Sequence, residues 1–330
     1  MLIHVNAAEH RAVFRDIKPI FKGIQDAPLL GFTVEGHVLY ITCQCGVVYE
    51  QQMASEESGP YSLTVLYQDL SELLPGHGTA SLELTPLFVG VRTENMSATL
   101  QQANGMISRY KPRCKSYQKI PCDEVKRWAR LFSETAPVAK SLQREASIIF
   151  KPPHAIMKYS TFWLQVDNTL LDTCMDLREL KAVADFGPTE FGTTEDAIEF
   201  RRGAAIMALA RTTAGSCKFV EDMLGDHEKP VTMAGGAYLP KVQQFLRSVG
   251  PGPCSCYFYS SGMDLAVNRP KAQSSLKIGR CDNLITSLPT FLEYTQMVFK
   301  IFGDAPIDIS KGRSSICLCS QNVRMLLATV

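Results

Sequence analysis

The apolar and polar positions of this chain follow two alternating periods. Stretches with a period of 3.6 residues predict amphipathic helices, and each is followed by stretches of strict alternation, which predict strands. The first helix is expected over residues 9–24, with Val13, Ile17 and Phe21 on its apolar side. Its other side is cationic and carries Arg11, Arg15, Lys18 and Lys22. Pro19 should kink this helix or end it near Lys18, because proline lacks the amide donor.

The same order of elements, a helix and then strands, recurs six times at a spacing of roughly 50–55 residues. The other predicted helices are Gln68–Leu74, Asp123–Thr135, Asp176–Phe186, Tyr238–Val249 and Pro289–Phe302. Two units form one domain of about 110 residues. The sequence therefore predicts an α+β fold of three similar domains, 1–112, 113–215 and 216–330. Each helix has one apolar face and must pack on a sheet, so six such units would curve into an arc lined by helices.

Composition narrows the class of protein. The chain is 45% hydrophobic and 20% charged, as in soluble globular proteins, and its formal net charge is only +1. Any contact with nucleic acid must therefore come from segregated charge. No apolar run approaches the ~20 residues that span a membrane, and MLIHVNAAEHR does not resemble a signal peptide. We expect a cytoplasmic protein without a membrane partner.

Eleven cysteines are spread along the chain, and three pairs have Cys-x-Cys spacing: Cys43/Cys45, Cys254/Cys256 and Cys317/Cys319. A two-residue step places both side chains on one face of a strand. Paired core cysteines are therefore the favoured interpretation, and a metal or redox site is the alternative. No second cluster with metal-ligand spacing lies nearby, so no metal or cofactor is predicted.

The six-unit count, together with the closing run NVRMLLATV, resembles the sliding DNA clamps, in particular the three-domain bacterial DNA polymerase III beta subunit. The resemblance covers essentially the whole chain and is one of architecture. It implies the DNA clamp fold, a closed ring with helices lining the inside and sheets outside. Three domains per chain imply a head-to-tail homodimer, with DNA polymerase and a clamp loader as partners.

In such a ring the cationic helix faces would line the hole and contact the phosphates of double-stranded DNA without reading bases. The DNA-binding candidates are Arg11, Arg15, Lys18, Lys22, Lys126, Arg127, Arg130, Arg178, Lys181, Lys241 and Arg247. Acidic residues on the same helices, Asp16 among them, favour the alternative of ordinary solvated faces. The second and sixth helices are nearly free of positive charge, and the sixth has only Lys300.

Bacterial clamps bind a short hydrophobic peptide of their partners in a pocket next to the C-terminus. Matched by position, the pocket would involve Tyr159, Ser160, Thr161, Phe162, Arg324, Met325, Leu326 and Leu327. The bacterial pattern at the first of these places is a Thr-x-Gly-His-Arg-Leu type run, where this chain has KYSTFW. A distant clamp of viral origin fits this departure better than a typical bacterial one. The alternative is that these residues are plain core.

The sequence thus predicts a DNA polymerase processivity factor that encircles duplex DNA and tethers replication proteins. One alternative is an open or hetero-oligomeric clamp-like accessory protein that binds DNA but forms no homodimeric ring. Another is a structural protein with a duplicated α+β domain. An enzyme is not expected, because the six histidines are isolated and the chain has no His-Glu-x-x-His, G-x-S-x-G or P-loop motif.

Overall fold

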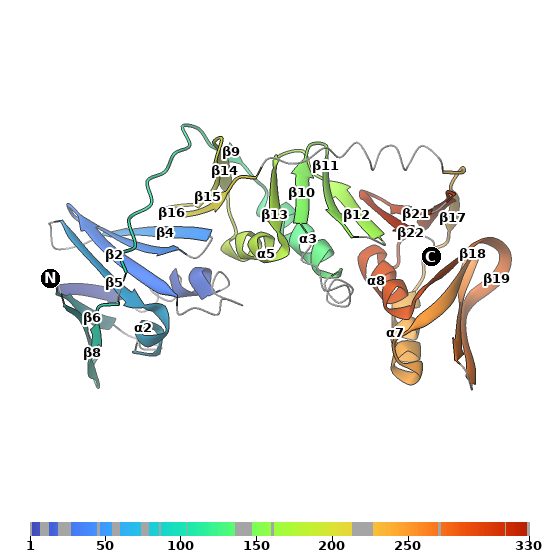
Figure 1. Cartoon of the computed structure of the whole chain (residues 1–330), viewed down its shortest axis with the longest axis horizontal. Helices are drawn as coiled ribbons and strands as arrows, with labels where there is room; N and C mark the ends of the chain where they lie inside the picture. The colour runs from blue at the N-terminus through green and yellow to red at the C-terminus, as the bar shows by residue number, and fades with distance from the viewer. Residues whose placement is uncertain are drawn as a thin grey trace. The chain divides into compact units, whose positions relative to one another are not determined.

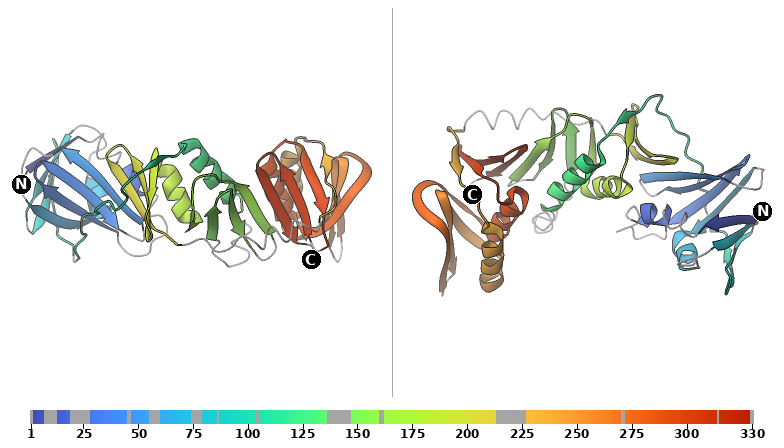
Figure 2. Two further views of the ribbon diagram at one scale, coloured as in Figure 1. Left: turned by 90° about the horizontal axis from the view of Figure 1, so that it is seen from above. Right: turned by 180° about the vertical axis from the view of Figure 1, so that it is seen from behind.

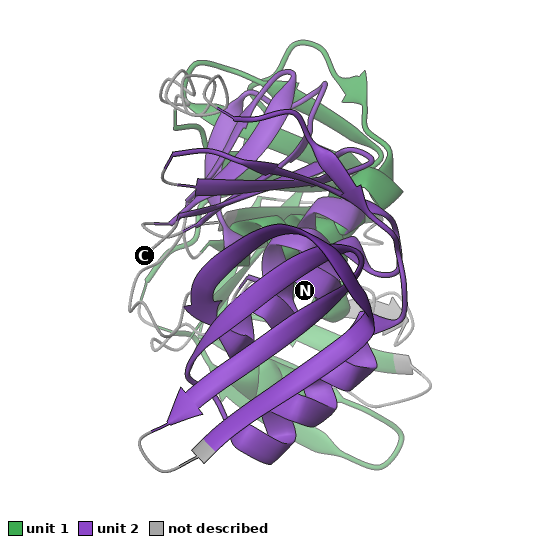
Figure 3. Ribbon diagram, turned by 90° about the vertical axis from the view of Figure 1, so that its right-hand side faces the viewer, with its two compact units in different colours: residues 1–126, 178–212 green, residues 127–177, 213–330 purple. Residues whose placement is uncertain are grey.

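The computed structural model divides into two compact units, residues 1–126 with 178–212 and residues 127–177 with 213–330 (Figure 3). Three domains at the expected boundaries stay a prediction. The structure describes residues 2–6, 13–18, 28–44, 47–54, 60–73, 79–85, 87–103, 105–135, 147–159, 162–212, 227–269, 272–313 and 315–328.

Unit 1 contains an eight-stranded antiparallel sheet with the strand order β5-β2-β3-β4-β16-β15-β14-β9 (Figure 1). Its strands are β2 (Leu29–Glu35), β3 (Val38–Gln44), β4 (Val47–Ala54), β5 (Tyr61–Leu66), β9 (Gln118–Lys119), β14 (Glu190–Thr193), β15 (Ala197–Arg202) and β16 (Ala205–Ala210). The ladder between β4 and β16 joins segments about 150 residues apart in one sheet. A second sheet has the order β1 (Leu2–Asn6), β6 (Thr79–Leu84), β7 (Phe88–Arg92) and β8 (Ser97–Gln101).

Both faces of the large sheet of unit 1 are covered. Residues 39–43 of β3 are all buried, which an alternating strand with one solvated face would not be. On one face lie the helical residues 13–18 and α5 (Leu177–Phe186), with the rings of Tyr49 and Phe186 6.0 Å apart in an edge contact. The short helix α2 (Tyr67–Leu73) follows β5. The other face is crossed by the segment from β8 to β9 (Figure 1).

Two buried glutamates bind the segment between β8 and β9, which we name the crossing segment, to the sheet. Glu50 of β4 accepts a hydrogen bond from the backbone N–H of Tyr110 (2.8 Å), and Glu199 of β15 accepts one from that of Arg113 (2.7 Å). At Gly192 of β14 the segment lies so close that a Cβ atom would stand 2.7 Å from the carbonyl oxygen of Ser116. The run SRYKPRCKSYQ (108–118) is strongly basic and predicts a linker between domains, whereas in the structure this segment is a fixed part of unit 1.

Unit 2 contains a second eight-stranded antiparallel sheet, ordered β13-β10-β11-β12-β22-β21-β20-β17 (Figures 1 and 2). Its strands are β10 (Ser147–Lys151), β11 (His154–Lys158), β12 (Phe162–Asp167), β13 (Thr173–Asp176), β17 (Val231–Met233), β20 (Ile307–Lys311), β21 (Ser315–Ser320) and β22 (Val323–Ala328). Helix α3 (Cys122–Ser133) packs Trp128 and Phe132 against Phe150 of β10, with ring centroids 5.3 and 6.4 Å apart. Helix α8 (Leu292–Phe302) covers β12, where the ring centroid of Tyr294 is 5.9 Å from that of Phe162.

A long two-stranded ribbon, β18 (Pro253–Arg269) and β19 (Ala272–Phe291), adjoins α7 (Tyr238–Val249) in unit 2. It bends where its register shifts between Phe258 and Ser261. Gly279 lies opposite this bend with φ +74°, and a Cβ atom there would stand 2.3 Å from the carbonyl oxygen of Ser261. The runs CSCYFYSS, DLAV and SSLKIG and residues 283–286 predict separate short strands, whereas in the structure they belong to two continuous, bent strands.

Most helix predictions match the structure, and the last one needs a correction at its start. Helix α7 has the predicted bounds, Tyr238–Val249. Pro289, expected in the first turn of the last helix, instead lies in β19 opposite Ser255, and α8 begins at Leu292. The ladder with β18 continues to Phe291 and keeps the backbone extended beyond the proline.

The interpretation of paired core cysteines is confirmed for one described pair and for one member of the other. Cys254 and Cys256 are both buried on one face of β18, and Cys317 is buried in β21 with Cys319 partly exposed. Cys43 is buried, and Cys45 lies outside the described residues. Within the described ranges every cysteine is a free thiol, and no group of three or more His, Cys, Asp or Glu side chains could hold a metal ion. The described helices include none that is long and apolar enough to cross a membrane.

Candidate functional site

The described DNA-binding candidates lie on helices, on the side away from the apolar positions. In residues 13–18, Arg15 and Lys18 are exposed and Val13 and Ile17 are buried. Three further helices carry the other described candidates: α3 has Lys126, Arg127 and Arg130, α5 has Arg178 and Lys181, and α7 has Lys241 and Arg247. All of these are exposed except Arg127, which is partly buried. Arg11 and Lys22 lie outside the described residues.

Most of these helix cations have no carboxylate partner. Among described residues, no ion pair is formed by Arg15, Lys18, Lys126, Arg127, Arg130, Lys181, Lys241 or Arg247. By contrast, four arginines outside the helices pair with carboxylates: Arg92 with Glu83, Arg109 with Glu35, Arg113 with Asp196, and Arg202 with Asp16. Lys300 of α8 is also paired, with Glu134 at 3.2 Å. The helix faces therefore keep positive charge that the described part of the chain does not neutralise.

Asp16 does not offset the cations beside it. Its side chain is only 2% exposed, pairs with Arg202 and accepts a hydrogen bond from the Tyr49 hydroxyl (3.2 Å). Burial and the adjacent Asp16 carboxylate raise the pKa of Tyr49 well above its ordinary value, so the phenol stays protonated and donates. Arg202 also donates to the carbonyl oxygen of Phe186 at the end of α5. Asp16 is therefore an internal contact that holds residues 13–18 in place, and its carboxylate does not neutralise the exposed cations beside it.

The described peptide-pocket candidates converge on one strand pair. β12 and β22 are antiparallel neighbours, with Phe162 opposite Leu327 and Leu164 opposite Met325. Tyr159, just before β12, stacks on Phe162 with ring centroids 4.5 Å apart, and burial raises the pKa of its phenol. Ser160 and Thr161 lie outside the described residues.

Strand alternation divides these candidates between two faces of the sheet. Phe162, Met325 and Leu327 share the face on which α8 packs, which we name the helix face. Leu326 lies on the opposite face, in a buried cluster with Trp163, Ile156 and Cys317. Arg324 is on that opposite face too, across from Gln165. The structure therefore places two of the four tail residues, Met325 and Leu327, on the same face as Phe162, and Arg324 and Leu326 on the other.

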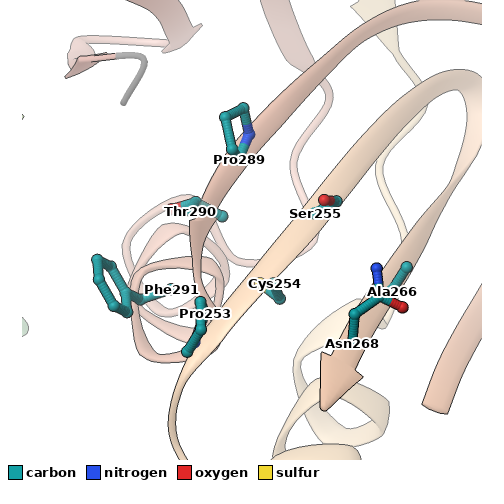
Figure 4. Close-up of a pocket in the computed structure, with 8 residues that line it drawn as sticks. All are labelled: Pro253, Cys254, Ser255, Ala266, Asn268, Pro289, Thr290 and Phe291. Atoms are coloured by element: carbon teal, nitrogen blue, oxygen red, sulfur yellow. The ribbon is translucent and has the colours of Figure 1, made fainter. Parts of the chain in front are cut away.

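Two aromatic residues that the sequence did not single out extend this group. Tyr294 of α8 contacts Phe162, and Phe291, 42% exposed, lies 5.6 Å from Tyr294 between ring centroids. Phe291 also lines a cavity of about 250 Å³ along the ribbon β18–β19, with Ala266 and Asn268 at its other end (Figure 4). Nothing local in the sequence links Phe291 or Tyr294 to Phe162, because they are about 130 residues apart.

The architecture is that of the sliding clamps, the fold of the bacterial DNA polymerase III beta subunit, and this confirms the resemblance drawn from the six-unit pattern. A clamp from Helicobacter pylori, crystallised bound to a DNA ligase peptide, matches with a TM-score of 0.77 at 8% identity, over 100% of both chains. The sliding clamp of Bacillus subtilis matches with a TM-score of 0.77 at 12% identity, over 100% of this chain and 99% of that chain. The beta subunit of Pseudomonas aeruginosa gives 0.74 at 11% identity over 100% of both chains. No model of a known protein family and no curated protein matches the sequence.

Proposed function

We propose that this chain is a sliding clamp, a processivity factor that encircles double-stranded DNA and tethers DNA polymerase and other replication proteins. The observation that carries the proposal is the set of unneutralised cations on the helices of a chain with the clamp fold. Lysine and arginine on helices suit a protein that slides, since they contact phosphates at any sequence without reading bases. The protein itself supplies no reaction in this function.

The proposed ring is a head-to-tail homodimer, with three clamp domains per chain at 1–112, 113–215 and 216–330. Unpaired strand edges support it. In the described residues β8 pairs only with β7, and β18 and β19 pair only with each other. An exposed edge is a template for pairing with another chain. The edge of β8 in one chain would pair with the ribbon of the next, and two such contacts would close the ring.

The proposed partner site is the aromatic series from Tyr159 and Phe162 through Tyr294 to Phe291. Its inner members are buried, and its outer member Phe291 reaches the surface beside the largely apolar cavity of the ribbon. A hydrophobic peptide side chain could extend the series there, since aromatic residues dominate binding energy at such sites. DNA polymerase and a clamp loader are the proposed sources of such peptides.

DNA binding is tested with two matched triple variants of unit 1. One removes helix cations, Arg15→Gln, Lys126→Gln and Lys181→Gln. The control removes three exposed lysines next to or within the crossing segment, Lys111→Gln, Lys115→Gln and Lys119→Gln. Binding to a fluorescent duplex is followed by anisotropy across a salt series. Each lost phosphate contact lowers the magnitude of the slope of log K against log salt by about 0.9. The slope of the helix variant should therefore be smaller by up to about 2.7, and that of the control variant should change little. Equal losses in both variants would contradict a DNA-facing helix surface.

Ring formation needs a separate measurement. The proposal expects a solution mass near twice 36.6 kDa and retention on nicked circular DNA that is lost when the circle is cut. A monomer at micromolar concentration that binds duplexes with the same salt dependence would overturn the ring and favour the open or hetero-oligomeric alternative.

The partner site is tested by selecting peptides from a displayed random library on the intact protein. Peptides that bind the proposed site should lose most of their affinity for Phe291→Ala. They should keep it for Leu284→Ala, a control at another exposed apolar residue of β19. Selected peptides that bind both variants equally would show that Phe291 is not part of the partner site.

A further inference from the structure

A small polar pocket opens on unit 2 at the end of the β12–β22 ladder that lies away from Phe162. Its volume is about 100 Å³, and its lining includes Arg324 of β22, Gln165 and Asp167 of β12, and His154 of β11. The strand register explains why these side chains meet. Gln165 is directly opposite Arg324, and His154 is directly opposite Asp167.

This pocket lies on the face of the sheet opposite the helix face. Residues 163, 165 and 167 of β12 point to one side, and 162, 164 and 166 to the other. Phe162 contacts α8, so Gln165 and Asp167 belong to the opposite face, with Arg324 as their cross-strand neighbour. The pocket is therefore distinct from the aromatic series proposed as the partner site.

Several polar groups of the pocket are left without partners. Arg324 and Asp167 carry opposite charges into one small space, yet neither forms an ion pair with the other or with any described residue. Gln165, which lines the same pocket, is only 8% exposed. The Nδ1 atom of His154 is buried and unpartnered as well. Buried polar groups are almost always hydrogen-bonded, so the unpartnered Nδ1 atom of His154, next to two partly exposed charges that form no ion pair, points to a missing partner.

The backbone around the pocket is firmly held. Asn168, fully buried, donates from its side chain to the carbonyl oxygens of His154 (3.3 Å) and Leu171 (2.7 Å). Its side-chain oxygen accepts from the backbone N–H groups of Leu170 (3.2 Å) and Leu171 (2.9 Å). Asn168 directly follows Asp167, so these bonds fix the chain on the side of the pocket formed by His154 and Asp167. A pocket that is held in place beforehand loses little entropy when a ligand enters.

We propose that this pocket binds the dipolar head group of a small α-amino acid. Arg324 would hold the carboxylate, because a guanidinium matches a carboxylate with two parallel hydrogen bonds. Asp167 would hold the ammonium group, and Gln165 and His154 would complete the hydrogen bonds. The small volume admits only a few heavy atoms, which favours glycine or alanine over larger ligands.

Two other occupants fit the pocket less well. A simple anion would satisfy Arg324 but would face the carboxylate of Asp167 without a counter-charge. A metal ion is disfavoured, because the described residues hold no group of His, Cys, Asp or Glu with metal-binding geometry. Only a ligand of both charges satisfies both Arg324 and Asp167.

The test is isothermal titration of the full chain with glycine and with L-alanine, and with acetate and methylammonium as half-ligands. We expect saturable binding of an amino acid, and at least about tenfold weaker binding of each half-ligand, since each lacks one charged hydrogen-bonding group. Asp167→Asn should weaken amino-acid binding at least about tenfold. Asp282→Asn, an exposed carboxylate of β19, is the matched control and should bind like the parent protein.

Several results would overturn the proposal. They are the absence of saturable binding at the highest soluble concentration, acetate binding as tightly as alanine, or equal affinity in Asp167→Asn and the parent. Circular dichroism of each variant checks that it is folded, and Arg324→Gln gives a second, independent removal of one charge. None of these outcomes depends on DNA binding or on ring formation, so the proposal fails or stands apart from the clamp function.

Discussion

Replacing Glu199 with glutamine should strongly destabilise unit 1. The Glu199 side chain is buried in β15 and accepts four hydrogen bonds from the crossing segment. One oxygen accepts from the hydroxyl of Tyr110 and the backbone N–H of Arg113, both at 2.7 Å. The other accepts from the hydroxyl of Tyr117 and the backbone N–H of Cys114. This one carboxylate therefore anchors a segment more than 80 residues distant in sequence.

The expected loss follows from the chemistry of the amide. In Glu199→Gln one oxygen becomes an NH₂ group, which cannot accept, so two hydrogen bonds are lost and donors face a donor. A hydrogen bond to a charged group contributes about 1.5–3 kcal/mol, which gives about 3–6 kcal/mol for two. Burying a neutral amide in place of a charge recovers part of this. We expect the free energy of unfolding of unit 1 to fall by about 2–4 kcal/mol.

The assay is urea unfolding followed by two probes. Both tryptophans, Trp128 and Trp163, lie in unit 2, so their fluorescence reports that unit and serves as an internal reference. Far-ultraviolet circular dichroism reports both units. Glu195→Gln is the matched control, since Glu195 is exposed in the turn between β14 and β15. A loss below about 0.5 kcal/mol, or the same loss in the control, would refute the reasoning.

The pH dependence gives an independent check on Glu199. Burial alone would raise the pKa of Glu199, but hydrogen bonds from Tyr117, Arg113 and Tyr110 outweigh it and hold the pKa below its ordinary value. A carboxylate whose pKa is lower in the folded than in the unfolded state stabilises the fold at pH values above its unfolded pKa, about 4.3 for glutamate. This stabilisation disappears as the pH falls through the pKa of the folded state. Burial raises the pKa of Glu50, so the contribution of Glu50 to the pH dependence of stability has the opposite sign. The stability difference between parent and Glu199→Gln should therefore shrink below about pH 4, and a difference constant with pH would contradict the assignment.

Two further substitutions test the packing of unit 1. Gly192→Ala would place a Cβ atom 2.7 Å from the carbonyl oxygen of Ser116 and 2.8 Å from the Cβ of Cys114, so we expect a loss of about 1–3 kcal/mol in urea unfolding. Arg202→Met leaves the Asp16 carboxylate buried without its ion pair and should cost about 3–5 kcal/mol. Adding Asp16→Asn should recover much of that loss, and a double variant as unstable as the sum of the singles would argue against the pairing.

Local sequence patterns predicted the helices well. The features that depend on pairing between distant strands could not be predicted from them. Helix α7 is found with its predicted bounds, because its apolar period is regular and Gly250 follows it directly. Pro289 is a favourable first-turn residue for a helix, so the sequence placed the start of the last helix there. In the structure Pro289 is instead part of the ladder with β18, whose residues lie more than 30 positions earlier in the sequence. The bend of this ribbon likewise depends on a register that no short window of sequence contains.

The crossing segment shows the same limit for charged residues. Its arginines indicated a basic linker, yet Arg109 and Arg113 are committed to Glu35 and Asp196, carboxylates more than 70 residues distant in sequence. Helix cations were the better sequence signal, because the 3.6-residue period alone assigns them to the side away from the core. Asp16 was the exception, since its partner Arg202 is 186 residues away.

Consecutive residues of a strand point to opposite faces of its sheet, so they cannot all line one pocket. The site candidates of unit 2 are therefore divided between two faces. The sequence comparison carried over the run from Arg324 to Leu327 as a block, but neighbouring side chains on β22 point to opposite faces. Met325 and Leu327 lie with Phe162 on the helix face, where the aromatic series leads to Phe291. Arg324 lies on the other face, beside Gln165. One terminal strand can therefore serve two sites at once. A Phe291→Ala variant should lose peptide binding and keep amino-acid binding, whereas Asp167→Asn should do the reverse, and a variant that lost both would show that the two faces are coupled.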